Sequence, residues 1–151
     1  MEASLRSATP DYADGIRRLV DEAYALYVPR IGRQPAPMTA DYAALIAAGT
    51  VTVAELDGDV VGVLVTHPHA AHLLVENVAV APPYQGRGLG RLLLGQAERQ
   101  ARDLGLPELR LYTNEAMVEN LAMYPRLGYV EVGRNVEAGF ARVHFRKPVN
   151  S

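Results

Sequence analysis

Hydrophobic residues recur with two different periods along the chain, and the changes of period predict alternating strands and helices. Strand-like apolar stretches lie at residues 3–8, 51–56, 60–66, 73–80, 109–113, 130–136 and 140–147. Helical spacing is found in residues 10–28, 39–48 and 88–104 and again after Asn114. Asp57-Gly58-Asp59 and Glu137-Ala138-Gly139 are typical of hairpin turns. The strand, long helix and strand between residues 73 and 113 predict a parallel pair.

Residue types at the ends of these segments predict where the helices begin and end. Thr9, Thr39 and Asn114 each stand where an N-cap is needed, and all three types can cap a helix. Pro29 is expected to end the first helix because proline cannot donate the helical hydrogen bond. Gly105 is expected to end the long helix. Between Tyr27 and Met38, three prolines predict an ordered but irregular connection.

The stretch from Leu73 to Val80 is nearly all apolar, as expected for a strand that is covered on both faces. Glu76 and Asn77 interrupt it. A carboxylate on a central strand is costly unless it is paired or solvated. Glu76 is therefore interpreted as facing a cleft that holds a substrate. The alternatives are a salt bridge to a nearby arginine or a place at the solvated end of the strand.

Composition limits the classes of function. A chain of 151 residues fits one domain over residues 1–151, with 49% hydrophobic and 21% charged residues. A net charge of −2 gives no indication of binding to nucleic acid or to an anionic membrane. There is no cysteine, which excludes disulfides and thiolate metal sites. No apolar run approaches a membrane span, so a cytoplasmic location is expected.

Three histidines lie close together at His67, His69 and His72. They suggest a metal site, but no carboxylate or cysteine stands beside them and Pro68 breaks any regular spacing. A loop between two strands, with no bound metal, is the preferred interpretation.

A glycine-rich turn, Gln85-Gly86-Arg87-Gly88-Leu89-Gly90, joins the apolar strand to the long helix. The glycines leave backbone N–H groups uncovered, and the helix directs its positive dipole end at the same place. This combination favours a phosphate site, to which Arg87 and Arg91 add charge. A dinucleotide-binding loop would need glycine in place of Arg91, and a P-loop would need Gly-Lys-Ser/Thr. The turn resembles the pyrophosphate loop of the GNAT superfamily of acyl-CoA-dependent N-acetyltransferases. An ordinary glycine-rich turn is the alternative.

A second stretch, TNEAMVENLAMYPRLGY from Thr113 to Tyr129, also resembles this superfamily. There, an asparagine-bearing helix that ends in Y-x-x-x-G-F/Y lies beside the CoA thiol, and the ending falls here on Tyr124, Gly128 and Tyr129. Asn120 stands four residues before Tyr124, whereas many members place the asparagine seven before, where this chain has Met117. Pro125 is a further departure and should bend the last turn. For Tyr124 the alternative role is packing against Leu127.

The resemblance implies an α/β (α+β) fold. Its mixed, mostly antiparallel central sheet carries helices on both faces and a parallel pair of strands that splays at the CoA site. It implies acetyl-CoA as the cofactor, Tyr124 as the acid that protonates the leaving thiolate, and Glu76 as the base that accepts the amine proton. The residues implied in cofactor binding are Val78, Ala79, Val80, Gln85, Gly86, Arg87, Gly88, Leu89, Gly90, Arg91, Asn120 and Tyr124.

In the superfamily, the segment between the first two helices commonly lines the acceptor site. The matching candidates are Tyr27, Arg30, Arg33 and Met38. The two arginines suggest a carboxylate or phosphate on the acceptor, although solvated arginines in a stiff loop explain them equally well. The acceptor is expected to be a small-molecule or peptide amine. A homodimer, which is common in the family, stays open, and a non-catalytic acyl-CoA sensor is the rival function.

Overall fold

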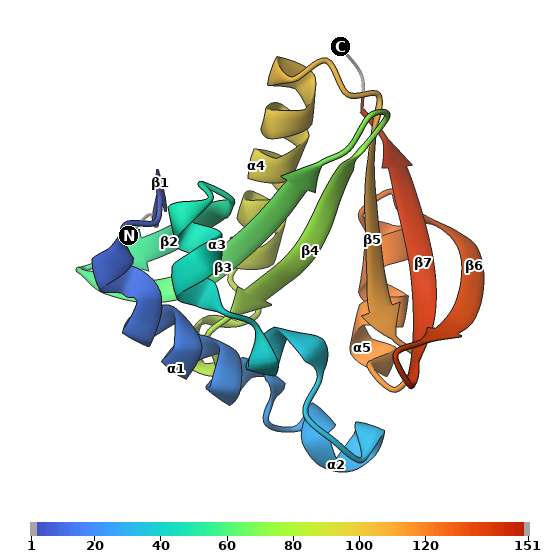
Figure 1. Ribbon diagram of the computed structural model, residues 1–151, viewed down its shortest axis with the longest axis horizontal. Helices are drawn as coiled ribbons and strands as arrows, with labels where there is room; N and C mark the ends of the chain where they lie inside the picture. Colours follow the sequence, from blue (N-terminus) through green and yellow to red (C-terminus); the bar gives the residue numbers. More distant parts are fainter. Residues whose placement is uncertain (1–2, 150–151) are drawn as a thin grey trace. The chain divides into compact units, whose positions relative to one another are not determined.

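The computed structural model describes residues 3–149, and its elements follow the predicted order (Figure 1). The strands are β1 (Ser4–Ser7), β2 (Val51–Leu56), β3 (Asp59–Pro68), β4 (Leu73–Val80), β5 (Glu108–Asn114), β6 (Val130–Glu137) and β7 (Phe140–Pro148). The α-helices are α1 (Ala13–Tyr24), α2 (Tyr27–Ile31), α3 (Tyr42–Ala47), α4 (Leu89–Asp103) and α5 (Val118–Arg126). Short 3-10 turns are η1 (Pro10–Tyr12), η2 (Ala36–Thr39) and η3 (Pro82–Tyr84).

Across residues 3–149 the strands form one seven-stranded sheet in the order β1-β2-β3-β4-β5-β7-β6. The β1–β2, β2–β3, β5–β7 and β6–β7 pairs are antiparallel. β4 and β5 are parallel, with Leu73 to Val75 in register with Leu109 to Leu111. The predicted mixed, mostly antiparallel α/β fold with one parallel pair is therefore confirmed.

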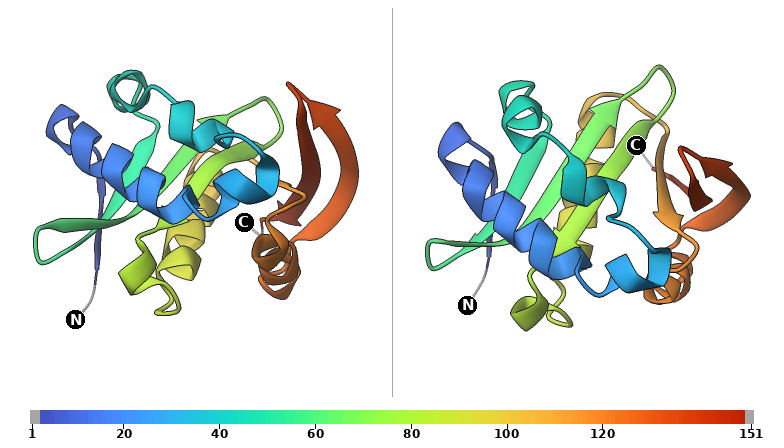
Figure 2. Two further views of the ribbon diagram at one scale, coloured as in Figure 1. Left: turned by 90° about the horizontal axis from the view of Figure 1, so that it is seen from below. Right: turned by 60° about the horizontal axis from the view of Figure 1, so that its bottom comes forward.

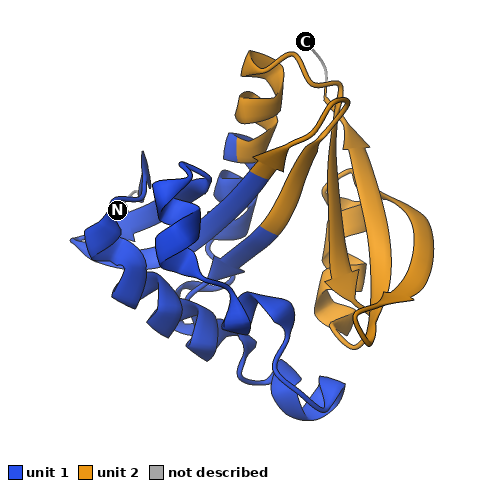
Figure 3. Ribbon diagram, viewed as in Figure 1, with its two compact units in different colours: residues 1–66, 77–96 blue, residues 67–76, 97–151 orange. Residues whose placement is uncertain are grey.

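The chain divides into two compact units (Figure 3). Unit 1 comprises the described residues of 1–66 and 77–96, and unit 2 comprises the described residues of 67–76 and 97–151. In unit 1, α1 and the first turns of α4 lie on opposite faces of the strands (Figure 2). The core of unit 1 includes Ile16, Val20, Val53, Val63, Leu64 and Leu93, all fully buried.

Unit 2 is built on the antiparallel strands β5, β7 and β6 with α5. Its core side chains include Leu109, Leu111, Val143 and Phe145, each no more than 2% exposed. β6 is the last strand of the sheet, and all eight of its residues are exposed. None of the helices within residues 3–149 has both the length and the apolar character needed to cross a membrane.

The first helix does not end at Pro29 as predicted. α1 ends at Tyr24, and Pro29 lies inside the short helix α2, which Gly32 closes with a φ of 89°. Pro29 is the third residue of α2, in the first turn, where no helical N–H bond is required of it. The segment between Tyr27 and Met38 therefore has more regular structure than its prolines predicted, because it also contains η2.

Two predicted N-caps are also wrong. α3 is capped by Asp41, whose Oδ1 accepts the N–H of Ala44 at 3.1 Å, whereas Thr39 donates its hydroxyl to the Ala36 carbonyl. Asn114 is the last residue of β5, and its Oδ1 accepts the N–H of Ala116 at 2.8 Å. Both side chains bond backbone groups of turns near the helices and not the N–H groups at the helix ends. Threonine and asparagine side chains bond local backbone equally well in turns and at helix N-termini.

The apolar strand is covered less completely than predicted. Along β4, Leu73, Val75, Asn77 and Ala79 are buried, while the alternate residues are only partly buried. The histidine segment also differs, because His67 and Pro68 are the last residues of β3 rather than loop.

The fold makes one prediction about packing inside unit 1. A Cβ on Gly62 of β3 would lie 2.9 Å from Leu93 Cδ1 and 3.3 Å from Ala54 Cβ. Because both neighbours are fully buried, Gly62→Ala should lower the free energy of unfolding by about 1–3 kcal/mol. Urea denaturation measures this. Gly133→Ala is the matched control, since a Cβ there meets nothing within 4 Å. Equal effects of the two variants would contradict the packing described.

Candidate functional site

In the second half of β4, some main-chain N–H and C=O groups point away from β3, toward the opposite edge of the strand. The N–H of Ala81 donates to the Val61 carbonyl at 2.9 Å, and Ala79 O lies 3.4 Å from a Cβ built on Gly62. Because main-chain directions alternate along a strand, Val78 and Val80 face the opposite edge. β4 is the last strand of unit 1, so that edge has no strand partner within this unit.

Two contacts agree with this direction. The carbonyl of Val78 lies 3.4 Å from the Tyr24 hydroxyl, and the carbonyl of Val80 accepts the side-chain Nε2 of Gln85 at 3.0 Å. Of the three predicted strand contacts, Val78 and Val80 therefore present their backbone to the edge without a strand partner. Ala79 is buried and presents its backbone to β3.

The glycine loop between η3 and α4 has the backbone geometry of an anion site. Gly86 and Gly88 have φ values of 79° and 84°, a region that favours glycine. The main-chain N–H groups of residues 86–91 make no hydrogen bond within the described part of the chain. The N–H of Gln85 bonds the Pro82 carbonyl at 3.3 Å. The run of available N–H groups therefore begins at Gly86, one residue after the start of the predicted phosphate loop.

Both arginines of the loop are exposed, and the guanidinium of Arg87 lies 5.4 Å from the centre of the Tyr84 ring. α4 starts at Leu89 and runs for 15 residues, so its positive dipole end coincides with the free N–H groups. The loop thus offers directed donors and positive charge at one place, which is the requirement for binding a phosphate.

Tyr124 lies on α5 in unit 2 and is 5% exposed. Its ring packs edge-on against Tyr129 at 5.5 Å and lies tilted against Phe145 at 5.6 Å. The loop after α5 is fixed on the Tyr124 carbonyl, which accepts the N–H of Tyr129 at 3.1 Å.

Asn120, on the same helix, uses its side-chain amide inside unit 2. Nδ2 donates to Thr113 Oγ1 at 3.2 Å and lies 3.7 Å from Met117 Sδ. The amide therefore links α5 to the end of β5.

Tyr129 was recognised in the sequence only as the last residue of the Y-x-x-x-G-F/Y ending, with no role of its own. Its hydroxyl is buried and has no hydrogen-bond partner among the described residues. Burial raises the pKa of Tyr129 far above the usual range, and the charges of Tyr124 and Glu98 act in the same direction. Tyr129 therefore stays protonated beside Tyr124.

Glu76 stands on the partly exposed side of β4, with 36% of its side chain exposed. Its Oε2 lies 3.3 Å from His67 Nε2, so the pairing partner in unit 2 is a histidine rather than the arginine considered above. His67 lies near the end of β3 and Glu76 lies on the neighbouring strand β4. The sequence could have suggested this pair only if it had shown that β3 extends as far as His67.

The other two histidines stack on each other, with ring centres 4.7 Å apart. Burial, and then the charge of His69, lowers the pKa of His72. Within residues 3–149, no group of three or more histidine, cysteine, aspartate or glutamate side chains is arranged to hold a metal ion.

The acceptor candidates all belong to unit 1. Arg30 and Tyr27 lie on α2, with the guanidinium 5.4 Å from the ring centre. Arg33 is exposed in the turn after α2. Met38 lies in η2, and its carbonyl accepts Arg17 Nη1 at 2.6 Å. Arg17 was not identified from the sequence, because nothing in its neighbourhood on α1 indicates a long-range contact.

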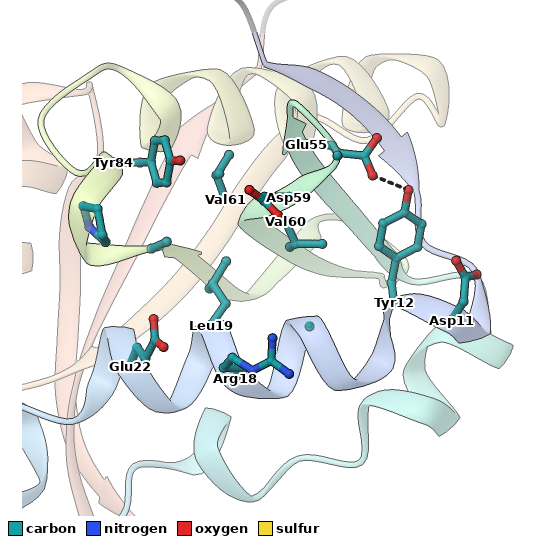
Figure 4. Close-up of a pocket in the computed structure, with 14 residues that line it drawn as sticks. Asp11, Tyr12, Arg18, Leu19, Glu22, Glu55, Asp59, Val60, Val61 and Tyr84 are labelled. Carbon is teal, nitrogen blue, oxygen red and sulfur yellow. Dashed lines mark hydrogen bonds between the residues drawn. The ribbon is translucent and has the colours of Figure 1, made fainter.

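Unit 1 also contains a cavity of about 500 Å³ between α1, the β2–β3 hairpin and η3 (Figure 4). Tyr12 donates to Glu55 in its wall at 2.6 Å, and this bond raises the pKa of Tyr12. None of the residues predicted for the site lines this cavity. Its lining residues are Asp11, Tyr12, Gly15, Arg18, Leu19, Glu22, Glu55, Gly58, Asp59, Val60, Val61, Ala81, Pro83 and Tyr84.

In a comparison with known proteins, residues 16–129 match the model of the acetyltransferase (GNAT) family. A mycothiol acetyltransferase from Streptomyces coelicolor is 36% identical over 80 residues, which are 52% of this chain and 26% of that protein. N-alpha-acetyltransferase 80 from Mus musculus is 43% identical over 70 residues, 46% of this chain and 20% of that protein. The matches thus span less than a third of these relatives' own length.

Among solved structures, the PaiA N-acetyltransferase of Thermoplasma acidophilum in complex with coenzyme A superimposes with a TM-score of 0.82. The alignment covers 98% of this chain and 99% of that one at 15% sequence identity. At that identity the likeness establishes the fold alone.

Proposed function

Because the chain belongs to the GNAT acetyltransferase family, we propose that it transfers an acetyl group from acetyl-CoA to a primary amine. The acceptor amine attacks directly while both substrates are bound. This proposal includes the organisation of residues 1–151 as a single N-acetyltransferase domain. A cytoplasmic location stays a prediction from the sequence, and a homodimer stays open.

The observation that carries the proposal is the run of N–H groups at residues 86–91 that bond no other residue of the described range 3–149. Six adjacent donors at the start of a long helix are unfavourable unless water or an anion satisfies them. Gly86 and Gly88 have open space where a Cβ would lie, so an anion can approach the backbone closely. The residues present therefore fit a diphosphate such as that of coenzyme A.

Bound acetyl-CoA would supply a thioester, whose acyl carbon is open to attack by an amine. Residues 86–91 would hold its diphosphate, with Arg87 and Arg91 adding charge. The backbone of Val78 and Val80 would hold the pantetheine arm by strand-like hydrogen bonds, because it faces an edge without a strand partner in unit 1.

Glu76 is proposed as the group that takes a proton from the amine. A lysine-like amine has a pKa of about 10.4, so at neutral pH it needs a base before it can attack. Glu76 is partly exposed, which leaves its carboxylate accessible, and His67 at 3.3 Å can hold its orientation.

Tyr124 is proposed as the group that gives a proton to the departing thiolate. A phenol ordinarily has a pKa of about 10 and so carries a proton at neutral pH. Its ring is held by Tyr129 and Phe145, which fixes the direction in which the hydroxyl points. The same packing supports the rival function, a non-catalytic acyl-CoA sensor in which Tyr124 is only a core residue.

The acceptor would bind along α2 and η2. Arg30 and Arg33 are exposed and suit a carboxylate or phosphate on the acceptor, while Tyr27 and Met38 offer apolar surface beside them. This proposal names a class of acceptor, an amine with an anionic group, rather than one compound.

Tyr124→Phe tests the transfer mechanism. It should leave the Kd for acetyl-CoA nearly unchanged and lower kcat by on the order of 10²-fold, because it removes only the proton donor. The measurement is release of free CoA thiol with the dipeptide Ala-Ala, whose carboxylate matches the proposed acceptor class, and with spermidine and glucosamine, which lack an anionic group, as comparison acceptors. Tyr112→Phe, also in unit 2, is the matched control. An unchanged kcat in Tyr124→Phe would remove this residue from the mechanism.

Gly88→Asp tests the cofactor loop. A side chain at a φ of 84° strains the backbone, and its carboxylate would repel a phosphate. The Kd for acetyl-CoA, measured by calorimetry, should rise by roughly 100-fold or more. Gly49→Asp is the matched control, because Gly49 has a φ of 76° and open space but lies after α3. Retained affinity in Gly88→Asp would show that the loop does not hold phosphate.

A further inference from the structure

A chain of buried hydrogen bonds crosses unit 1 from α1 to η2. The Tyr24 hydroxyl donates to Asn77 Oδ1 at 2.6 Å, and Asn77 Nδ2 donates to the Tyr42 hydroxyl at 3.0 Å. Tyr42 in turn donates to the Pro37 carbonyl at 2.7 Å. The three side chains are 9%, 5% and 2% exposed, so water does not replace these bonds.

The direction of this chain is fixed by the number of protons available. The hydroxyl proton of Tyr42 is used on Pro37, so Tyr42 can only accept from the Asn77 side-chain N–H. The proton of Tyr24 is used on the Asn77 oxygen. The amide of Asn77 therefore has one orientation only, with its oxygen toward α1 and its nitrogen toward α3.

Asn77 occupies a position at which burial alone would favour an apolar residue. Its neighbours on the same face of β4 are Val75 and Ala79, both buried. A buried amide is tolerated only when its polar atoms are bonded. Asn77 therefore contributes something that valine would not, namely a specific link from β4 to α1 and α3.

A second clamp holds the same segment. Arg17 on α1 donates Nη1 to the Met38 carbonyl at 2.6 Å and Nη2 to the Ala40 carbonyl. Its guanidinium lies 4.9 Å from the centre of the Tyr42 ring. Three carbonyls in residues 37–40 are thus bonded to side chains of α1 and α3, and Met38 lies among them.

We propose that Asn77, Tyr24 and Tyr42 are positioning residues that hold residues 36–40, the acceptor segment, against the strand that binds acetyl-CoA. This inference rests on the proposed function, in which Met38 contacts the acceptor and Val78 contacts the cofactor. Asn77 precedes Val78 on β4, and Tyr24 reaches both Asn77 and the Val78 carbonyl. One amide therefore connects the two substrate-binding parts of unit 1.

The expected effect is on the acceptor more than on the cofactor. Tyr42→Phe removes both bonds at the acceptor end and keeps the ring, so the KM for the amine should rise about 10-fold, the worth of about one hydrogen bond. The Kd for acetyl-CoA should stay within about twofold of the original, because the loop and the backbone of β4 are untouched.

A double-mutant cycle separates a connected chain from independent contacts. Tyr24→Phe should also raise the KM for the amine, since it breaks the same chain at its other end. If the bonds depend on one another, the KM for the amine should rise about 10-fold in the double variant, as in each single variant, rather than by the product of the two single rises. Tyr12→Phe is the matched control, because the Tyr12 hydroxyl bonds Glu55 and takes no part in the hydrogen bonds between Tyr24, Asn77 and Tyr42.

The kinetic measurement uses whichever of spermidine, glucosamine and Ala-Ala the unmodified protein acetylates fastest. Hydrogen exchange of the amides of residues 36–42 is followed in the same proteins and should quicken in Tyr42→Phe but not in Tyr12→Phe. This second readout needs no acceptor and can use Tyr24→Phe alone if Tyr42→Phe does not fold.

Three outcomes would overturn the proposal. The first is an unchanged amine KM in both variants, and the second is unchanged exchange in residues 36–42. The third is a rise in the Kd for acetyl-CoA as large as the rise in the KM for the amine, because the bonds would then support only β4 and not the acceptor segment. Failure of the proposed function is recognised separately, since the unmodified protein would then neither bind acetyl-CoA nor release CoA with any of the amines.

Discussion

The structure depends on the uneven hydrogen bonding of β4. Leu73 to Val75 are paired with β5, and the last five residues of the strand extend beyond that register. In unit 1, β4 bonds β3 on one side, while Val78 and Val80 direct their backbone to the other. The glycine loop, which follows η3, adds six N–H groups without a protein partner in the described chain. The proposal of a cofactor site rests on this combination, because backbone N–H groups without a protein partner need water or a ligand to satisfy them.

The side chains of β4 divide in the same way. The buried side carries Asn77, whose two bonds fix the positions of Tyr24 and Tyr42. The partly exposed side carries Glu76 beside His67. Two adjacent residues thus have opposite tasks, one holding the fold of unit 1 and the other available for chemistry, because successive side chains of a strand point to opposite faces.

Much of the fold could be predicted because strong local signals decide it. All seven strands, the long helix and both hairpins follow from the apolar period and from turn residues such as Asp57 and Gly58, which have φ values of 52° and 86°. Helix ends were harder to predict. Thr39 and Asn114 bond nearby backbone in turns, and Pro29 lies in a helix rather than after one. Residue type alone does not distinguish these placements from the predicted ones.

The candidate site could be predicted only where it consists of backbone. The glycine loop is visible in sequence because positive φ values select glycine. The partners of Glu76, Asn77 and Met38 are not visible, because His67, Tyr42 and Arg17 reach them through the fold from distant positions. A polar side chain on a strand predicts that a partner exists, but its identity depends on which element packs against that face.

The most direct test of this account is titration of the protein with acetyl-CoA while the melting temperature is followed. At about 100 times its Kd, a ligand that binds only the folded state adds about 2.7 kcal/mol to stability. For a chain of this length that corresponds to a rise of several degrees. The account predicts such a rise, and a smaller one for S-acetylpantetheine, which lacks the diphosphate and the nucleotide attached to it. No rise at saturating acetyl-CoA would contradict the assignment of the glycine loop and, with it, the proposed acetyl transfer.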